Sequence, residues 1–283
     1  MAPKVWLITG AGSGFGKETT KQALESGDSV LATDINVAGL AELQSAYPAD
    51  KLLVQKLDVT SAQDITDAFA AAKKTFGHLD VVFSNAGHGV ASELEGLTPE
   101  HARGLFDVDF WGATNVGLAA VKFFREENAP GVGGRLLFTS SMLGQMVFPI
   151  VGIYNSAKHA LEGYAETLAA ELDPSWNIKI TILEPGIYRT GAVSNTKVLP
   201  VHPAYDKPHL ATTAIRQMIT NPNIGGDPKK LVKQVLKLVE LEKPPLRIVL
   251  GKDAIGAIEA HYNAQLQNIK EFASWSEDLE HDA

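Results

Sequence analysis

The segment KVWLITGAGSGFG, residues 4–16, joins a short apolar run to a glycine-rich turn near the start of the chain. Residues 4–9 have the apolar, partly β-branched composition of a buried strand, and the turn over residues 9–16 opens a helical pattern. Glycines at such a turn let backbone N–H groups approach a phosphate at the helix N-terminus. A strand, this turn and a helix in succession therefore predict a dinucleotide-binding unit.

Buried-strand patterns recur along the chain and alternate with amphipathic helical patterns. We expect helices over 17–26 and 62–76, and two more that begin at Thr98-Pro99 and Asp227-Pro228, where an N-cap residue precedes a first-turn proline. The further strands are expected over residues 29–33, 51–57, 79–85, 134–141, 178–185 and 246–251. Strands that alternate with helices form parallel sheets, so the sequence predicts an α/β fold, a doubly wound parallel sheet with helices on both faces.

The alternation runs to about residue 186 without a repeat or a linker, so residues 1–283 are expected to form a single domain. Residues 190–227 contain four prolines and no long periodic pattern, which predicts an irregular segment that acts as a substrate-binding lid. The acidic end, residues 273–283, is expected either to be flexible or to pack through Trp275.

Composition excludes several classes of function. The net charge is −8, and the densest basic set, Lys229, Lys230, Lys233 and Lys237, has the spacing of a solvated helix face, so no nucleic-acid partner is expected. The chain has no cysteine, so disulfides and thiolate metal sites are impossible, and we expect no metal. No apolar run approaches the roughly 18 residues of a membrane span and no signal peptide is recognisable, which predicts a soluble, cytoplasmic protein without a membrane partner.

Three residues narrow the kind of nucleotide. Ala11 and Glu18 stand where a triphosphate-binding loop requires glycine and a magnesium-binding hydroxyl, so that class is excluded. Asp34 follows the second predicted strand, where a carboxylate accepts hydrogen bonds from the adenosine ribose and repels a 2′-phosphate. The sequence therefore favours NAD over NADP.

Tyr154 and Lys158 are four residues apart, so they lie on one face of a helix. An ammonium about 5–6 Å away, at an effective dielectric of about 20, favours the phenolate by about 3 kcal/mol. This amounts to roughly two pK units and lowers the pKa of the phenol from about 10 toward neutral pH, where it can act as an acid or base. The spacing alone also fits a surface helix with an ordinary tyrosine and a solvated lysine.

Five short motifs occur in one order along the chain: TGAGSGFG (9–16), SNAG (84–87), a serine thirteen residues before Tyr154, YNSAK (154–158) and PGIYRT (185–190). Together they resemble the short-chain dehydrogenase/reductase family from residue 4 to about 190, with LRIVLGKDA as the last strand. The resemblance implies a Rossmann-like sheet of about seven strands, a nicotinamide cofactor and an alcohol or carbonyl substrate. It also implies a homodimer or homotetramer, paired through the helices around 99–126 and 152–171.

The resemblance assigns roles by position. Tyr154 is expected to be the general acid/base, Lys158 its activator and a ribose ligand, and Ser141 the residue that hydrogen-bonds the substrate. The expected cofactor-binding residues, besides Tyr154 and Lys158, are Gly10, Ser13, Gly14, Phe15, Gly16, Asp34, Asp58, Val59, Asn85, Ala86, Gly87, Pro185, Gly186, Ile187 and Thr190.

The chain departs from the family pattern in the stretch LFDVDFWG (105–112), where Asp109 replaces the usual asparagine and is a further candidate catalytic residue. An ionised carboxylate near Lys158 would offset the ammonium, leave Tyr154 less acidic and shift alcohol oxidation to alkaline pH. If only the backbone carbonyl of Asp109 matters, the change is nearly silent.

Apolar residues between Ser141 and Tyr154 and in the predicted lid favour a fairly apolar substrate, although core packing explains them equally well. The expected substrate contacts are His88, Phe148, Val193, Leu199 and His202. The leading hypothesis is an NAD-dependent oxidoreductase that interconverts a secondary alcohol and a ketone, and EPGIYRT resembles the hydroxysteroid and retinol branch. The alternative is a catalytically weak, dinucleotide-sensing regulatory protein. A sugar-nucleotide epimerase is disfavoured by the glycine spacing and the short C-terminal part.

Overall fold

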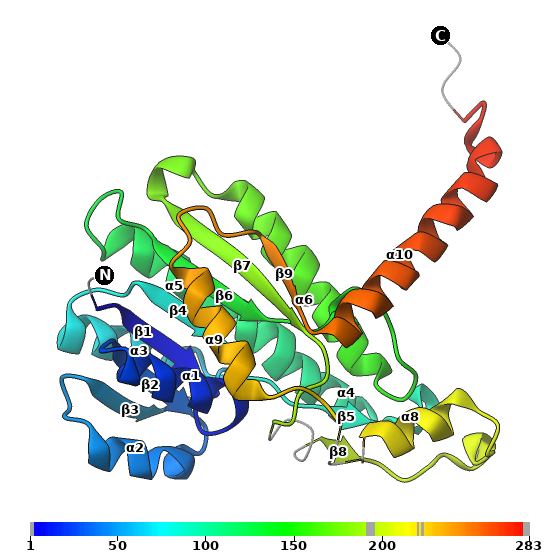
Figure 1. Cartoon of the computed structure of the whole chain (residues 1–283), viewed down its shortest axis with the longest axis horizontal. Helices are drawn as coiled ribbons and strands as arrows, with labels where there is room; N and C mark the ends of the chain where they lie inside the picture. Colours follow the sequence, from blue (N-terminus) through cyan, green and yellow to red (C-terminus); the bar gives the residue numbers. More distant parts are fainter. Residues whose placement is uncertain (1–2, 191–195, 220, 222–223, 280–283) are drawn as a thin grey trace.

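The computed structural model describes residues 3–190, 196–219, 221 and 224–279 (Figure 1). Seven parallel strands form one sheet in the order β3-β2-β1-β4-β6-β7-β9. The strands are β1 (Val5–Thr9), β2 (Ser29–Asp34), β3 (Leu52–Lys56), β4 (Val81–Ser84), β6 (Gly134–Thr139), β7 (Ile178–Pro185) and β9 (Arg247–Leu250). This Rossmann-like sheet confirms the predicted fold class and all of the predicted strands.

Helices cover both faces of the sheet because each presents an apolar stripe to it. On one face, α1 (Gly14–Glu25) and α9 (Pro228–Val239) pack over the strands in one buried cluster. On the other, α3 (Ala62–Phe76), α5 (Ala113–Glu126) and α6 (Gly152–Glu171) share a second buried cluster. The short helix α2 (Ala41–Ala46) follows the 3-10 turn Val37–Leu40 beside β3.

Capping residues set the helix starts that the sequence predicts. The Thr98 hydroxyl accepts from the His101 N–H at the start of α4 (Pro99–Phe106), and the Asp227 carboxylate accepts from the Lys229 N–H at the start of α9. Helix α4 leads into a π-helical segment, Asp107–Gly112, and then into α5. This segment, which the sequence pattern did not predict, carries Asp109.

Part of the predicted irregular segment 190–227 is regular, so that prediction is wrong in part. β8 (Lys197–Val198) pairs with β5 (Val90–Ala91), and α8 (Ala211–Ile219) fits between Pro208 and Pro222. Ile215 and Ile219 of α8 pack against the buried cluster that contains Met142 and Met146. Short 3-10 turns, Leu94–Gly96 and Pro203–Tyr205, complete this region. Residues 191–195, 220 and 222–223 lie outside the described part of the chain.

Helix α10 (Lys252–Glu271) was not predicted from the sequence, and it projects away from the sheet (Figure 1). Its first turns are anchored because Ala254 and Ile258 are buried near the start of α6. The 3-10 turn Ala273–Ser276 follows, and Trp275 is 78% exposed, which excludes packing of its ring on the body of the protein. Residues 280–283 of the predicted acidic tail lie outside the described part.

Among the described residues, drawn in colour in Figure 1, no helix has both the length and the apolar character that a bilayer span requires. The 3-10 turn η5 (Pro174–Trp176) connects α6 to β7, and the 3-10 turn η4 (Met142–Gly144) follows β6.

Candidate active site

The carboxyl ends of the central parallel strands meet at one edge of the sheet, where ligands bind in folds of this kind. The glycine-rich turn follows β1, Asp34 ends β2, Asn85 follows β4, and Gly186 follows β7. Ser141 follows β6 at the same edge. The topology therefore brings together residues that are up to about 180 positions apart in the sequence.

The turn after β1 has a backbone that only glycine adopts freely. Gly10 and Gly14 have φ values of +66° and +53°, and a Cβ on Gly10 would lie 2.8 Å from the Ala86 Cα. Within the described residues, Ser13 precedes α1 without a side-chain capping hydrogen bond, and the first turn of α1 holds no acidic residue. The close, side-chain-free turn and the uncapped helix N-terminus fit the phosphates of a dinucleotide.

A cleft of about 450 Å³ lies beside this turn and is lined by residues of both the glycine turn and the PGIYRT motif. Its lining residues are Gly14, Glu18, Arg189, Thr190, Asp227, Pro228 and Lys229. The structure therefore places Gly14 and Thr190, two of the residues predicted to contact the cofactor, on one cleft.

Asp34 is half-buried at the end of β2, and its carboxylate faces the glycine turn. Oδ2 accepts from the Gly12 N–H at 2.8 Å, and Oδ1 accepts from the Asn36 N–H at 2.8 Å. These bonds orient a carboxylate at the position where an adenosine ribose lies in nucleotide-binding sheets of this topology.

The other predicted cofactor residues lie along the same edge but differ in what their side chains do. The Asp58 carboxylate accepts from the N–H and hydroxyl of Thr60, and Val59 is buried against Gly112. The Asn85 side chain donates to the Thr9 carbonyl at 3.0 Å and accepts from the Thr139 hydroxyl, so it braces β1, β4 and β6. The Phe15 ring contacts Tyr188, and the Ile187 N–H donates to Asp253. The remaining predicted residues along this edge are Gly16, Ala86, Gly87, Pro185 and Gly186.

Ser141, Tyr154 and Lys158 converge at this edge. Tyr154 and Lys158 lie one turn apart on α6, and the Lys158 Nζ lies 5.4 Å from the centre of the Tyr154 ring. The Lys158 side chain is only 4% exposed, and its Nζ donates to the Thr139 carbonyl at 3.1 Å. The Ser141 hydroxyl lies close enough to the Tyr154 phenol to lower its pKa. A hydroxyl, a phenol and an ammonium therefore form one contiguous group.

Asp109 completes the group from the π-helical segment, and it is fully buried. Its Oδ2 lies 3.1 Å from the Lys158 Nζ. Its Oδ1 accepts from the His88 N–H at 2.9 Å and lies 3.4 Å from the His88 Nδ1. Of the two interpretations of Asp109, this geometry favours the one in which the carboxylate itself acts on Lys158.

A family model described as short chain dehydrogenase matches residues 4–198. The chain belongs to the short-chain dehydrogenase family. Its resemblance to that family, predicted from five motifs, is thereby confirmed, and the chain is an oxidoreductase of a family that uses nicotinamide dinucleotides.

This short-chain dehydrogenase is similar to an uncharacterized oxidoreductase of Schizosaccharomyces pombe, with 35% identity over 90% of this chain and 85% of the relative. It is 30% identical to a 3-ketodihydrosphingosine reductase of Bacteroides thetaiotaomicron, over 89% of each chain. Among solved structures, a short-chain dehydrogenase from Streptomyces avermitilis superposes with a TM-score of 0.88 at 31% identity, over 99% of this chain and 100% of that one.

Burial governs the protonation of Tyr154 in this dehydrogenase. Burial raises the pKa of the phenol most, Lys158 lowers it, Asp109 raises it and the hydrogen bond from Ser141 lowers it, and the net direction is upward. Lys158 lowers the pKa of the phenol as expected, but desolvation and the Asp109 charge outweigh the ammonium, so the net direction is upward.

Asp109 and Lys158 form an ionised pair. Burial raises the pKa of Asp109, but Lys158 and His88 lower it more, so the net direction is downward. Burial lowers the pKa of Lys158, but Asp109 and Tyr154 raise it more, so the net direction is upward. Each charge thus stabilises the other in surroundings that exclude water.

The predicted substrate contacts do not all line the same space. Phe148 and Leu199 belong to two apolar clusters that both include Tyr154, whereas the His88 ring faces Asp109. His202 caps the 3-10 turn Pro203–Tyr205 and packs its ring against Tyr205. Val193 lies outside the described residues.

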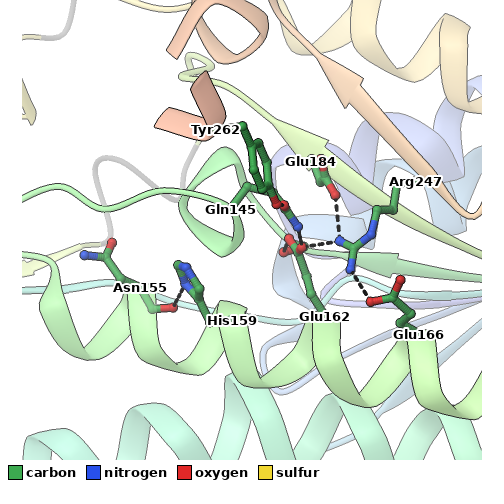
Figure 2. Close-up of polar contacts among 9 residues, drawn as sticks. Gln145, Asn155, His159, Glu162, Glu166, Glu184, Arg247 and Tyr262 are labelled. Carbon is green, nitrogen blue, oxygen red and sulfur yellow. Dashed lines mark hydrogen bonds and ion pairs between the residues drawn. The ribbon is translucent and has the colours of Figure 1, made fainter. Parts of the chain in front are cut away.

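Sequence reasoning missed a polar cluster that contacts the residues on either side of the Ser141 turn. Glu162 on α6, Glu184 on β7 and Arg247 on β9 are in contact, together with Gln145 and others (Figure 2). A glutamate one helical turn after Lys158 was the available signal, but the arginine partner is 85 positions away and only the sheet brings it close. Across the described residues, no group of three or more His, Asp or Glu side chains has the arrangement of a metal site.

Proposed function

We propose that this short-chain dehydrogenase interconverts a secondary alcohol and a ketone with NAD(H), by hydride transfer at a Ser141–Tyr154–Lys158 site. One observation carries the proposal. The Tyr154 phenol has the Ser141 hydroxyl, which lowers its pKa, and the Lys158 ammonium, 5.4 Å from its ring, as neighbours at the edge of the sheet that also holds the glycine turn. A phenol with these neighbours can release and accept a proton beside a bound carbonyl.

The proposed division of labour follows from the donors and acceptors in the site. Ser141 hydrogen-bonds the substrate oxygen and holds its carbon in place. In the oxidation, Tyr154 in its phenolate form takes the hydroxyl proton, and Lys158 stabilises the phenolate charge. Bound NAD supplies the hydride acceptor. In the reduction, Tyr154 returns the proton to the carbonyl oxygen.

The choice of NAD is supported by Asp34. Its carboxylate is oriented by the Gly12 and Asn36 N–H groups. A 2′-phosphate at this position would face that negative charge, whereas ribose hydroxyls can donate hydrogen bonds to it. The residues predicted to hold the dinucleotide are those already named along the edge from Gly10 to Thr190.

A fairly apolar substrate is supported by the surroundings of Tyr154. Its ring joins one apolar cluster with Phe148, Ile187 and Ile215 and another with Leu97 and Leu199. The 3-ketodihydrosphingosine reductase relative is named for a ketone with a long apolar chain. We propose a substrate of this general class, with the segment around α8 as its lid.

The test begins with fluorescence titrations of NADH and NADPH, in which NADH is expected to bind more tightly. Turnover is then measured by NADH absorbance with cyclohexanone, acetophenone and benzylacetone, and with the corresponding alcohols and NAD. Tyr154→Phe is expected to retain NADH binding and to lose more than about a hundredfold in turnover. Tighter NADPH binding would contradict the choice of NAD, and full turnover in Tyr154→Phe would overturn the mechanism.

A second candidate function is dinucleotide sensing with weak catalysis, and the Asp109–Lys158 ion pair is the observation that favours it. The carboxylate 3.1 Å from the ammonium offsets the charge that Tyr154 depends on. Tight NADH binding together with no turnover of the panel at any pH up to that of Tyr154 ionisation would favour this alternative.

A further inference from the structure

A buried carboxylate lies beneath the turn that carries Ser141. Glu162 is on α6, one helical turn beyond Lys158, and is 2% exposed. Its Oε1 accepts from the Ser140 hydroxyl at 2.5 Å, and its Oε2 accepts from the Gln145 amide and from Arg247 (Figure 2). Burying a charge is costly unless it is paired and hydrogen-bonded, so these contacts hold Glu162 in one position.

The two neutral contacts of Glu162 lie at the two ends of the same short turn. Ser141 is the N-cap of the 3-10 turn Met142–Gly144, and Gln145 is its C-cap. Ser140 stands directly before Ser141, so Glu162 holds the residue before the turn and the residue after it. A Cβ on Gly144 would overlap the Glu162 carboxylate, which shows how closely the turn fits over it.

The partners of Glu162, Arg247 and Gln145, are themselves held by further side chains. Arg247 also donates to Glu184 and to Glu166, each at 3.0 Å, and the Tyr262 hydroxyl of α10 donates to Gln145 (Figure 2). An ion pair that only joined α6 to β9 would need just the half-buried Arg247 and the exposed Glu166. The buried Glu162 adds contacts that are directed at the Ser141 turn.

We propose that Glu162 is a positioning residue for Ser141, because its carboxylate ties Ser140 and Gln145 to α6 and so sets the Ser141 hydroxyl relative to Tyr154. The inference rests on the proposed function, in which Ser141 contacts the substrate. A displacement of about 1 Å at a reacting group can lower a rate by up to about a hundredfold.

The test uses Glu162→Gln, which keeps the shape but sets an amide N–H₂ against the donors around it. Its kcat with benzylacetone and NADH is expected to fall at least about tenfold, while its Kd for NADH stays within about twofold of the wild type. Glu166→Gln is the matched control: it lies one turn further on α6 and also contacts Arg247, but its side chain is 57% exposed and it does not hold the turn. Wild-type kcat is expected for this variant.

A role through Ser141 is separated from a general structural role by repeating the change in a Ser141→Ala background. There, Glu162→Gln is expected to lower kcat by less than about twofold further, because the hydroxyl it positions is gone. An equal loss in both backgrounds, or an equal loss in Glu166→Gln, would overturn the proposal. Ser140→Ala, which removes only the hydroxyl contact, serves if Glu162→Gln fails to fold, and the same background comparison applies to it.

A readout that needs no substrate keeps this inference distinct from the proposed function. Hydrogen–deuterium exchange of the amides of residues 142–145 is expected to speed up about tenfold in Glu162→Gln and not in Glu166→Gln. Faster exchange without any turnover of the panel in the wild type would contradict the proposed function alone. Unchanged exchange would contradict the positioning role, whatever the turnover.

Discussion

Asp109 stands where the family resemblance predicts an asparagine. It places a buried negative charge 3.1 Å from the Lys158 ammonium, in a π-helical segment beside His88. The ammonium that should favour the Tyr154 phenolate is thereby shared with a carboxylate. We therefore expect alcohol oxidation to reach its maximum at alkaline pH.

Asp109→Asn is expected to lower the pH of half-maximal alcohol oxidation by about one unit, because it removes a negative charge that raises the pKa of Tyr154. The measurement is the pH profile of kcat with NAD and the best alcohol of the panel. His88→Gln, which leaves the carboxylate in place, is the control and should shift the profile less. Identical profiles for Asp109→Asn and the wild type would exclude an effect of the charge.

Glu184 links protonation to stability. Burial raises its pKa most and Glu162 adds to this, while Arg247 lowers it, and the value rises from 4.5 to about 7. Between these values the folded chain keeps a proton that the unfolded chain releases. The unfolded state then binds fewer protons, so stability falls as the pH rises through this window, by at most about 3 kcal/mol.

Glu184→Gln is expected to remove this dependence, because an amide does not titrate. Relative to the wild type, the variant should therefore gain up to about 3 kcal/mol in free energy of unfolding between about pH 5 and pH 8. Urea unfolding at both pH values measures the difference. A gap between the two chains that stays constant with pH would show that Glu184 is ionised throughout, and Glu166→Gln provides an exposed control.

Among the elements, α8 is tied to the body of the protein by one buried ion pair. Arg216 donates to both carboxylate oxygens of Glu93 at 2.9 Å and to the Leu199 carbonyl at 2.7 Å. The His202 N–H donates to the same carboxylate. The pair joins α8, the loop after β8 and the chain after β5, which together border the apolar clusters around Tyr154.

Arg216→Ala is expected to loosen this segment, because it leaves the Glu93 carboxylate buried without its cation. Limited proteolysis within residues 196–219 should become at least about tenfold faster, with NADH binding unchanged. Arg125→Ala, which removes a surface pair with Glu126, is the control. Equal cleavage rates in the two variants would show that the ion pair does not hold α8 in place.

For the whole molecule, we propose a homo-oligomer that pairs through α5 and the segment before it. Trp111 and Leu118 are 56% and 51% exposed and lie seven residues apart, so they form an apolar stripe on one face. Tryptophan is a typical anchor of protein interfaces, and an exposed apolar patch is typical of an interaction surface.

The double variant Trp111→Ala, Leu118→Ala is expected to reduce the solution mass to that of the 30.3 kDa monomer, measured by light scattering. Helix α10 provides the control, since Leu266 and Ile269 form a second exposed apolar stripe on its projecting half. If the double variant Leu266→Ser, Ile269→Ser dissociates the oligomer and the α5 variant does not, the interface lies on α10. A monomeric wild type would exclude the oligomer.

The local patterns of the chain were sufficient for most of the architecture. Apolar runs bounded by glycine and proline predicted every strand of the main sheet. Thr98 and Asp227 predicted two helix starts, because both kinds of signal depend only on neighbouring residues. Helix α10 was missed because its outer half is exposed and weakly patterned. The π-helical segment was missed because its i→i+5 turn spans only six residues inside a longer helical run, which is too short to show a period of its own.

The order of the motifs determined the family, the carboxyl-edge site and the pairing of Tyr154 with Lys158, since helical spacing and strand ends are local properties. Only the folded chain set the charges of that site. Asp109 reaches Lys158 across 49 positions, and Arg247 reaches Glu162 across 85. Burial then outweighs the ammonium and raises the pKa of Tyr154. Desolvation and contacts between distant residues depend on the complete packing of the sheet and its helices, which no short stretch of sequence encodes.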